Sequence, residues 1–433
     1  MKKIILNLSL IIFFIPLTYS QKILTSEDAV GIALKYNYDI LVSRNNATTD
    51  SINNTTGNAG MLPNLNINGT ESYSTATNLY QKFSDGTTAS LSNTQSNSLN
   101  ASIGLSWTLF DGGKMFVTKR KLNEIQELGE IQFRDMVLQT VYDVILAYYD
   151  VVRQKQELAS INEVITYNLD RVKISQTSFD AGLSPKTNLL QAKIDLNVYQ
   201  ENAINQQSII LAAKRSLNQL LGRNTDVPFE VLDSIPISES LDNKVLSQKL
   251  DSSNTGILAY QKQVDIAKLS LKEMNSMLLP KITFNAGYGL FQSNSPEGNP
   301  LINRTIGPSV GGTVSIPIYQ GGNTIRQIKV ARIQLQSEQY NLENIRLQVN
   351  QQLQNALTQF ENQLTLLKIE KDNAILAKEN LEISIQRLRY GQTTSLEVSL
   401  AEGSFVESLT RLINFEYNLK VAETKLKQLF SRL

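Results

Sequence analysis

The chain has 433 residues, with no cysteine, no histidine, and 41 basic against 40 acidic side chains. The missing residue types exclude disulfides, thiolate nucleophiles, zinc-imidazole sites and Ser-His-Asp triads, and we expect no catalytic residue, cofactor or metal site. A formal net charge of +1 leaves no basic stripe for a phosphate backbone, so nucleic acid is not an expected partner.

Residues 1–20 have the pattern of a signal peptide. Lys2 and Lys3 precede a mostly apolar run from Ile4 to Leu17, and Thr18 and Ser20 supply small residues at the two positions that a signal peptidase reads. This run is shorter than the ~20 residues that span a bilayer as a helix. We therefore expect export and cleavage after Ser20, with a membrane anchor as the alternative. No transmembrane helix is expected further along the chain.

A β-hairpin is expected over residues 63–111. An incoming helix should end at Pro63, because proline has no amide hydrogen to donate. Apolar and polar residues then alternate over residues 64–69 and again over 99–109, which is the period of a β-strand. The polar, unpatterned segment 74–98 is expected to be the loop.

The side chains that alternate with the apolar ones in these strands are mostly Asn, Ser, Thr and Gly rather than charged residues. A strand with lipid on one face and a polar lumen on the other has this composition. A soluble β-sandwich shows the same alternation, so the pattern alone leaves both architectures open.

A long helical hairpin should follow the strands. Gly112 and Gly113 are expected to turn the chain from strand to helix, because glycine tolerates unusual backbone angles. Residues 113–180 then predict one long helix, and residues 185–221 predict a return helix after a turn at Gly182.

Apolar residues in both helices recur at alternating steps of three and four, the spacing of a coiled-coil seam. The row on the long helix runs through Val144, Tyr148, Val151, Leu158, Ile165, Leu169, Val172 and Phe179. A 3.5-residue repeat winds helices left-handedly, so a set of such hairpins would form a twisted cylinder. An ordinary four-helix bundle is the alternative.

The same order of elements occurs twice. Gly112 corresponds to Gly321 and Gly182 to Gly391, and both pairs have one offset, because 321 − 112 and 391 − 182 are both 209. We therefore divide the mature chain into two repeats, 21–221 and 254–433, joined by an equatorial linker over 222–253. In the second repeat we expect a helix ending at Pro280, a hairpin at about 280–320 with its loop at 293–304, a long helix over 322–389 and a return helix over 394–430.

This order of elements, used twice, resembles the TolC-like outer-membrane efflux family over nearly all of the mature chain. Four antiparallel strands cannot close a membrane barrel alone, because the smallest ones have about eight. The resemblance implies a mixed α and β fold: a homotrimer whose four strands per chain close one 12-stranded transmembrane β-barrel. A long α-helical coiled-coil barrel would continue it into the periplasm.

The function that the resemblance implies is that of an outer-membrane channel, the passive exit duct of a tripartite efflux or type I secretion system. It implies contact with outer-membrane lipid and two partners, a periplasmic adaptor protein and an inner-membrane transporter. A periplasmic adaptor-type coiled-coil protein, or an exported structural protein or enzyme, remains the alternative.

The resemblance also assigns roles to individual residues. The helix tips expected to contact the adaptor are Gly182, Leu183, Ser184, Gly391, Gln392 and Thr393. The positions expected to narrow the aperture are Glu397, Thr187 and Asn188. The structural turns are Pro63, Gly112, Gly113, Pro280, Gly321 and Gly322. Three Glu397 carboxylates meeting on an axis would select cations and raise at least one pKa; a solvated carboxylate near a helix N-terminus is the alternative reading.

Overall fold

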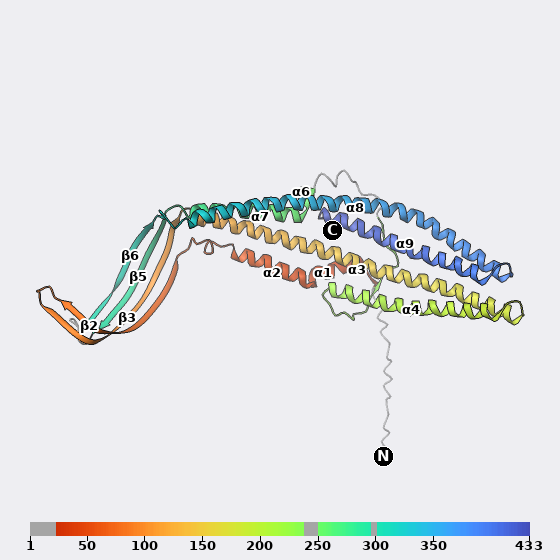
Figure 1. Cartoon of the computed structure of the whole chain (residues 1–433), viewed down its shortest axis with the longest axis horizontal. Helices are drawn as coiled ribbons and strands as arrows, with labels where there is room; N and C mark the ends of the chain where they lie inside the picture. The colour runs from red at the N-terminus through yellow and green to blue at the C-terminus, as the bar shows by residue number, and fades with distance from the viewer. Residues whose placement is uncertain (1–22, 238–249, 296–300) are drawn as a thin grey trace, which may run out of the picture.

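The molecule is elongated, with a β-sheet at one end and long helices that extend to the other end (Figure 1). The computed structural model describes residues 23–237, 250–295 and 301–433. The expected signal peptide, residues 1–20, lies outside the described residues, as does part of the expected linker.

The sheet has four antiparallel strands in the order β2-β3-β5-β6. Their bounds are β2 Asn64–Lys82, β3 Thr88–Asp111, β5 Lys281–Asn294 and β6 Ile302–Ser315. Each half of the chain supplies one hairpin, and the pairing of β3 with β5 joins them. The expectation of a mixed α and β fold with an antiparallel sheet is therefore correct.

The first hairpin is longer than the sequence indicated, and the prediction of a loop over residues 74–98 was wrong. Pairing between β2 and β3 continues to Lys82 opposite Thr88. The tight turn includes Gly86, which has φ +85°. Serine hydroxyl groups form hydrogen bonds across the strands, as Ser74 and Ser96 do at 2.7 Å between their Oγ atoms. In the second hairpin, likewise, strand structure extends into the segment 293–304 from both sides.

The incoming helices end before the two prolines, which corrects the prediction that Pro63 and Pro280 end them. The helices of this group are α1 Ser26–Tyr36, α2 Tyr38–Asn53, α6 Leu250–Ser253 and α7 Thr255–Ser276. Helix α2 ends at Asn53. We attribute this end to contacts between the next residue, Asn54, and the long helix, and not to Pro63. Lys119 Nζ donates to the Asn54 carbonyl oxygen at 3.0 Å, and the Asn54 amide donates to Gln126 at 2.7 Å.

Two helical hairpins form the rest of the molecule. They consist of α3 Lys114–Asp180 with α4 Lys186–Leu220, and of α8 Asn323–Arg389 with α9 Ser395–Leu429. Both long helices have 67 residues and both return helices have 35. None of the described helices is long and apolar enough to cross a membrane.

The core is divided along the long axis rather than gathered in one place. Near the middle, α1, α3, α4 and the short pair β1 Ile23–Leu24 and β4 Glu230–Val231 enclose Tyr148, whose hydroxyl donates to the Leu24 carbonyl at 2.9 Å. Separate clusters join α7, α8 and α9, and join α3, α8 and α9 nearer the tips.

The predicted apolar row on α3 is buried only along part of the helix. Val144 and Val151 are fully buried, whereas Leu169 is 52% exposed. In its place, Asn168 and Arg171 turn inward and are buried. Within one chain Leu169 therefore departs from the predicted seam, and Asn168 and Arg171 beside it face the partner helix α9.

Candidate functional site

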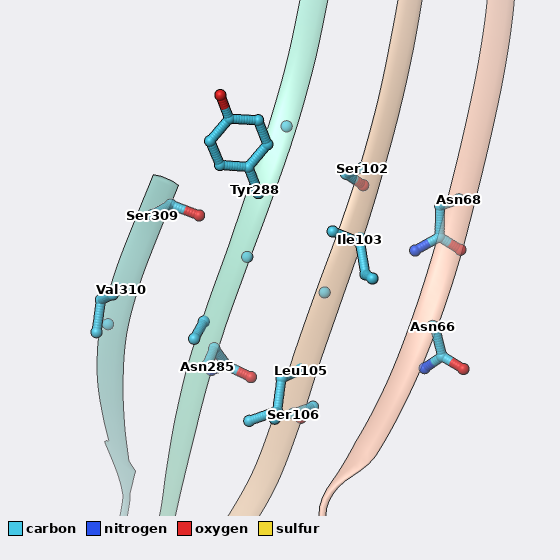
Figure 2. Close-up of a pocket in the computed structure, with 15 residues that line it drawn as sticks. Asn66, Asn68, Ser102, Ile103, Leu105, Ser106, Asn285, Tyr288, Ser309 and Val310 are labelled. Atoms are coloured by element: carbon cyan, nitrogen blue, oxygen red, sulfur yellow. The ribbon is translucent and has the colours of Figure 1, made fainter. Parts of the chain in front are cut away.

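The sheet has two chemically different faces, which are set by its register. One row runs through Asn68, Ser102, Gly289 and Gly307, and the adjacent row runs through Ile67, Ile103, Tyr288 and Pro308. Successive side chains on a strand point to opposite faces, so the first row lies on a polar face and the second on an apolar face. Figure 2 shows the middle of this sheet, with the four strands side by side.

The polar face carries small, uncharged side chains. From the row of Thr108 to the row of Ser98, every residue on this face is Asn, Ser, Thr or Gly, apart from Phe291. Residues of all four strands line a hollow of about 550 Å³ on the sheet. Such a surface is wettable and has no fixed charge, so it suits the wall of an aqueous passage rather than a selective binding site.

The apolar face and both edges of the sheet are uncovered in a single chain. Ile67 on edge strand β2 is 81% exposed, and Val310 on edge strand β6 is 73% exposed. A long apolar edge strand pairs readily with another chain, because its backbone donors and acceptors on the outer side have no partner in the sheet. Within the described part of one chain, nothing covers the apolar face or pairs with the outer sides of β2 and β6.

The expected tip residues lie in two helix turns at the end of the molecule farthest from the sheet (Figure 1). Gly182 and Gly391 follow α3 and α8 with φ of +71° and +67°. This left-handed conformation is the common end of a helix and favours glycine. Leu183 is 84% exposed, so an apolar side chain protrudes from the first tip.

The expected aperture residues lie at the starts of the two return helices. Glu397, in the first turn of α9, accepts from Arg387 Nη1 at 2.7 Å and from the Thr393 hydroxyl. The hydrogen bond from Thr393 and the nearby Arg387 lower the pKa of Glu397. On α4, Asn188 donates to Ser184 Oγ at 3.0 Å and Thr187 lies beside it. Within one chain, Glu397 is thus a paired carboxylate.

The expected glycine turns sit where strands pass into long helices. Gly113 and Gly322 precede α3 and α8, with φ of +81° and +74°. Gly112 and Gly321 have φ of +73° and +62°. Of these four positions, only Gly112 would bring an added Cβ within 4 Å of another described part of the chain, at 2.4 Å from the Ser276 carbonyl oxygen.

Sequence reasoning missed a buried cluster of charged residues near the tips. Arg171 on α3 is 1% exposed and contacts Asp195 on α4 and Glu402 on α9. Burial raises the pKa of Glu402, and hydrogen bonds from Asn168 and Arg171 only partly offset this. Burial, with Glu402 nearby, also raises the pKa of Tyr199 to about 12. Asn168 and Arg171 lie next to the predicted apolar row of α3 rather than in it, so the apolar spacing gave no signal of the cluster.

No group of three or more acidic side chains in the described part of the chain is placed to hold a metal ion.

Comparison with known proteins gives a consistent result. The family model described as outer membrane efflux protein matches residues 32–223 and 246–431. The outer membrane efflux protein BepC of Brucella suis is 25% identical over 340 residues, which cover 76% of this chain and 72% of that protein. The outer membrane protein TolC of Escherichia coli is 21% identical over 355 residues, covering 78% of this chain and 70% of TolC.

Solved structures share the fold at low sequence identity. The outer-membrane channel OprN has a TM-score of 0.79 at 14% identity and covers 94% of this chain and 90% of its own. The outer membrane protein VceC of Vibrio cholerae has a TM-score of 0.76 at 15% identity and covers 94% of this chain and 96% of its own. Because the family model matches both halves of the sequence, the chain belongs to the outer membrane efflux protein family.

Proposed function

We propose that the protein is an outer-membrane channel through which substrates leave the cell passively, as the exit duct of an efflux or type I secretion system. The observation that carries this proposal is the sheet, with an uncharged polar face, an apolar face and two open edges. Among its relatives, the alkaline protease secretion protein AprF of Pseudomonas aeruginosa is 21% identical over 308 residues, covering 69% of this chain and 63% of that protein.

The proposed assembly is a homotrimer. Four strands are too few for a transmembrane barrel, and three chains would bring 3 × 4 = 12 strands into one ring. Closing the ring would pair β2 of one chain with β6 of the next and remove every open edge. The apolar face would then meet lipid, and the polar face would line the lumen.

The chain is proposed to consist of two copies of one unit. The long helices start at Lys114 and Asn323 and the return helices at Lys186 and Ser395, and both differences, 323 − 114 and 395 − 186, equal 209. Three chains would place six helical hairpins around a tunnel. The tunnel is proposed to extend through the periplasm, because the helices run away from the sheet that would lie in the membrane (Figure 1).

The two tips are the proposed contact with a periplasmic adaptor, which would connect the duct to an energy-supplying transporter in the inner membrane. Exposed Leu183 and the turns at Gly182 and Gly391 support this role, because they form the end of the molecule away from the sheet. Ser184, Gln392 and Thr393 complete the proposed contact. Glu397, Thr187 and Asn188 remain the proposed aperture.

Purified protein tests the channel proposal directly. We expect the protein to occur in outer-membrane fractions. Its mass in detergent, after correction for the micelle, should equal that of three chains. Planar bilayers that contain the protein should show discrete conductance steps. The physical reason is that only the closed ring satisfies the strand edges and encloses the polar face. A native mass of one or two chains, or a trimer without conductance, would contradict the proposal.

A further inference from the structure

The buried charged cluster joins three helices near the tips. Arg171 Nη2 lies 2.6 Å from Asp195 Oδ2 and 3.2 Å from Ser395 Oγ, and Arg171 Nη1 lies 3.1 Å from Glu402 Oε2. Asn168, one turn away on α3, also donates to Glu402. The cluster therefore ties the α3–α4 hairpin of the first half to α9 of the second half.

Stability alone does not explain this cluster. Removing charged groups from water is costly, and well-packed apolar residues of similar size often stabilise a protein as much or more. Within the cluster, Arg171 Nε and Asn168 Oδ1 are buried without a hydrogen-bond partner, which adds to the cost. Buried polar groups are best attested as devices that select register or partner in coiled coils.

The proposed repeat makes the alternative partner of α3 explicit. Under the offset of 209, Glu402 on α9 corresponds to Lys193 on α4, because 402 − 209 = 193. If α3 packed against an α4 helix of another copy in the way that it packs against α9, Arg171 would face Lys193. A cation would then meet a cation at a buried position.

A second pair across the same interface follows the same rule. Thr410 Oγ1 on α9 donates to Glu157 Oε1 on α3 at 3.1 Å. The counterpart of Thr410 is Glu201 on α4, because 410 − 209 = 201. Packing of α3 against a foreign α4 would therefore also place Glu157 against Glu201, two carboxylates.

The long helix of the second half lacks the complementary charge. Arg171 corresponds to Asn380 on α8, because 171 + 209 = 380. Packing of α8 against a foreign α9 in this geometry would bury Glu402 without its cation. Packing of α8 against a foreign α4 would instead set Asn380 beside Lys193, which leaves no buried charge conflict.

We propose that these charges make α3 accept α9 and reject α4, so that helical hairpins of the first and second halves alternate. The preference of α3 for α9 over α4 rests on the proposed repeat. The alternation of hairpins around a tunnel rests also on the proposed trimer. Arg171 and Glu402 are specificity-determining residues of helix pairing.

Cross-linking of the full chain tests the pairing. The sequence contains no cysteine, so Glu157→Cys with Thr410→Cys gives a single reporter of α3–α9 contact. The two cysteines replace Glu157 and Thr410, so the second pair no longer contributes. The preference of α3 for α9 then depends on Arg171 and Glu402. In detergent-purified protein, a short bismaleimide should cross-link the two positions, as measured by peptide mass spectrometry.

Glu402→Lys in this background should lower the cross-link yield at least fivefold below that of Glu402→Gln protein, because Arg171 then faces a cation. Adding Arg171→Gln should restore the yield to within twofold of the matched control, Glu402→Gln. An unchanged yield in Glu402→Lys protein with normal helix content would overturn the proposal, as would failure of Arg171→Gln to restore it.

A neutral variant keeps the proposal testable if Glu402→Lys protein does not fold. Arg171→Gln, Asp195→Asn and Glu402→Gln together keep polar side chains of similar shape and remove the charges. We expect normal helix content but at least threefold less cross-linking, since the preference for α9 is lost. Normal helix content with a full yield would overturn the proposal. Both readouts report the contact between α3 and α9 and need neither conductance nor a particular number of chains, so they stand or fall separately from the channel proposal.

Discussion

Gly112 lies between strand β3 and helix α3, where the sheet joins the helices. It combines a left-handed backbone, φ +73°, with close contact to the end of α7. Its counterpart in the second half, Gly321, has φ +62° and no neighbour within 4 Å of the position that a Cβ would occupy. The two glycines therefore share a conformational requirement but differ in packing.

Alanine substitution should separate these two requirements. Gly321→Ala should cost about 1–2 kcal/mol of unfolding free energy, from the left-handed backbone alone. Gly112→Ala should cost about 1–3 kcal/mol more, because its Cβ would overlap the Ser276 carbonyl oxygen and force a shift of backbone. Denaturant unfolding followed by circular dichroism measures both, and equal costs would show that the contact seen at Gly112 is unimportant.

Among the elements, the strands carry the property on which transport depends. In the middle of the sheet, alternation along each strand and the pairing register place small polar side chains on one face, apart from Phe291, and mostly apolar ones on the other. A shift of one residue in the pairing of a strand would exchange its two faces. Adjacent residues such as Ser102 and Ile103 therefore belong to different environments in the proposed barrel.

Single cysteines at these two positions test the assignment of the faces. In intact outer membranes, Ser102→Cys should react readily with a charged, membrane-impermeant thiol reagent, because it would line the lumen. Ile103→Cys serves as the matched control and should react at least tenfold more slowly, since lipid excludes the reagent. Equal reactivity at both positions would rule out a membrane wall at this part of the sheet.

The helices show a similar dependence of role on neighbours. Regular apolar spacing predicted long helices over 113–180 and 322–389, and the structure has α3 at Lys114–Asp180 and α8 at Asn323–Arg389. Spacing could not predict that Arg171 would be buried while Leu169 stays exposed. Which of these two residues is buried depends on the rotation of α3 about its axis relative to α4 and α9. The spacing of apolar residues on α3 alone does not determine this rotation.

The proposed aperture would belong to the whole assembly, because Glu397 of one chain could form a ring only with Glu397 of two other chains. Within one chain, Arg387 pairs with this carboxylate across the turn between α8 and α9. The ring proposed from the family resemblance would thus carry three carboxylates, each held beside a cation. The net field at the tip depends on both residues.

Ion selectivity of the assembled channel tests the aperture. Glu397→Ala should reduce the preference for cations in reversal-potential measurements across a salt gradient, since it removes the proposed ring of negative charge. Arg387→Ala should raise the preference, because it leaves the carboxylates uncompensated. If neither substitution changes selectivity, Glu397 does not line the narrowest part of the passage.

The sequence by itself determined the local pattern of secondary structure. Alternating residues predicted the strands, apolar spacing predicted the long helices, and glycines marked the turns between them. These features depend on residues that are close along the chain, so no knowledge of distant neighbours was needed. Tertiary structure alone decided the length of the first hairpin, because the segment 74–98 becomes strand only through pairing across the turn. It also decided where α2 ends and which charges lie inside, because burial and the satisfaction of backbone groups depend on residues far away in the sequence.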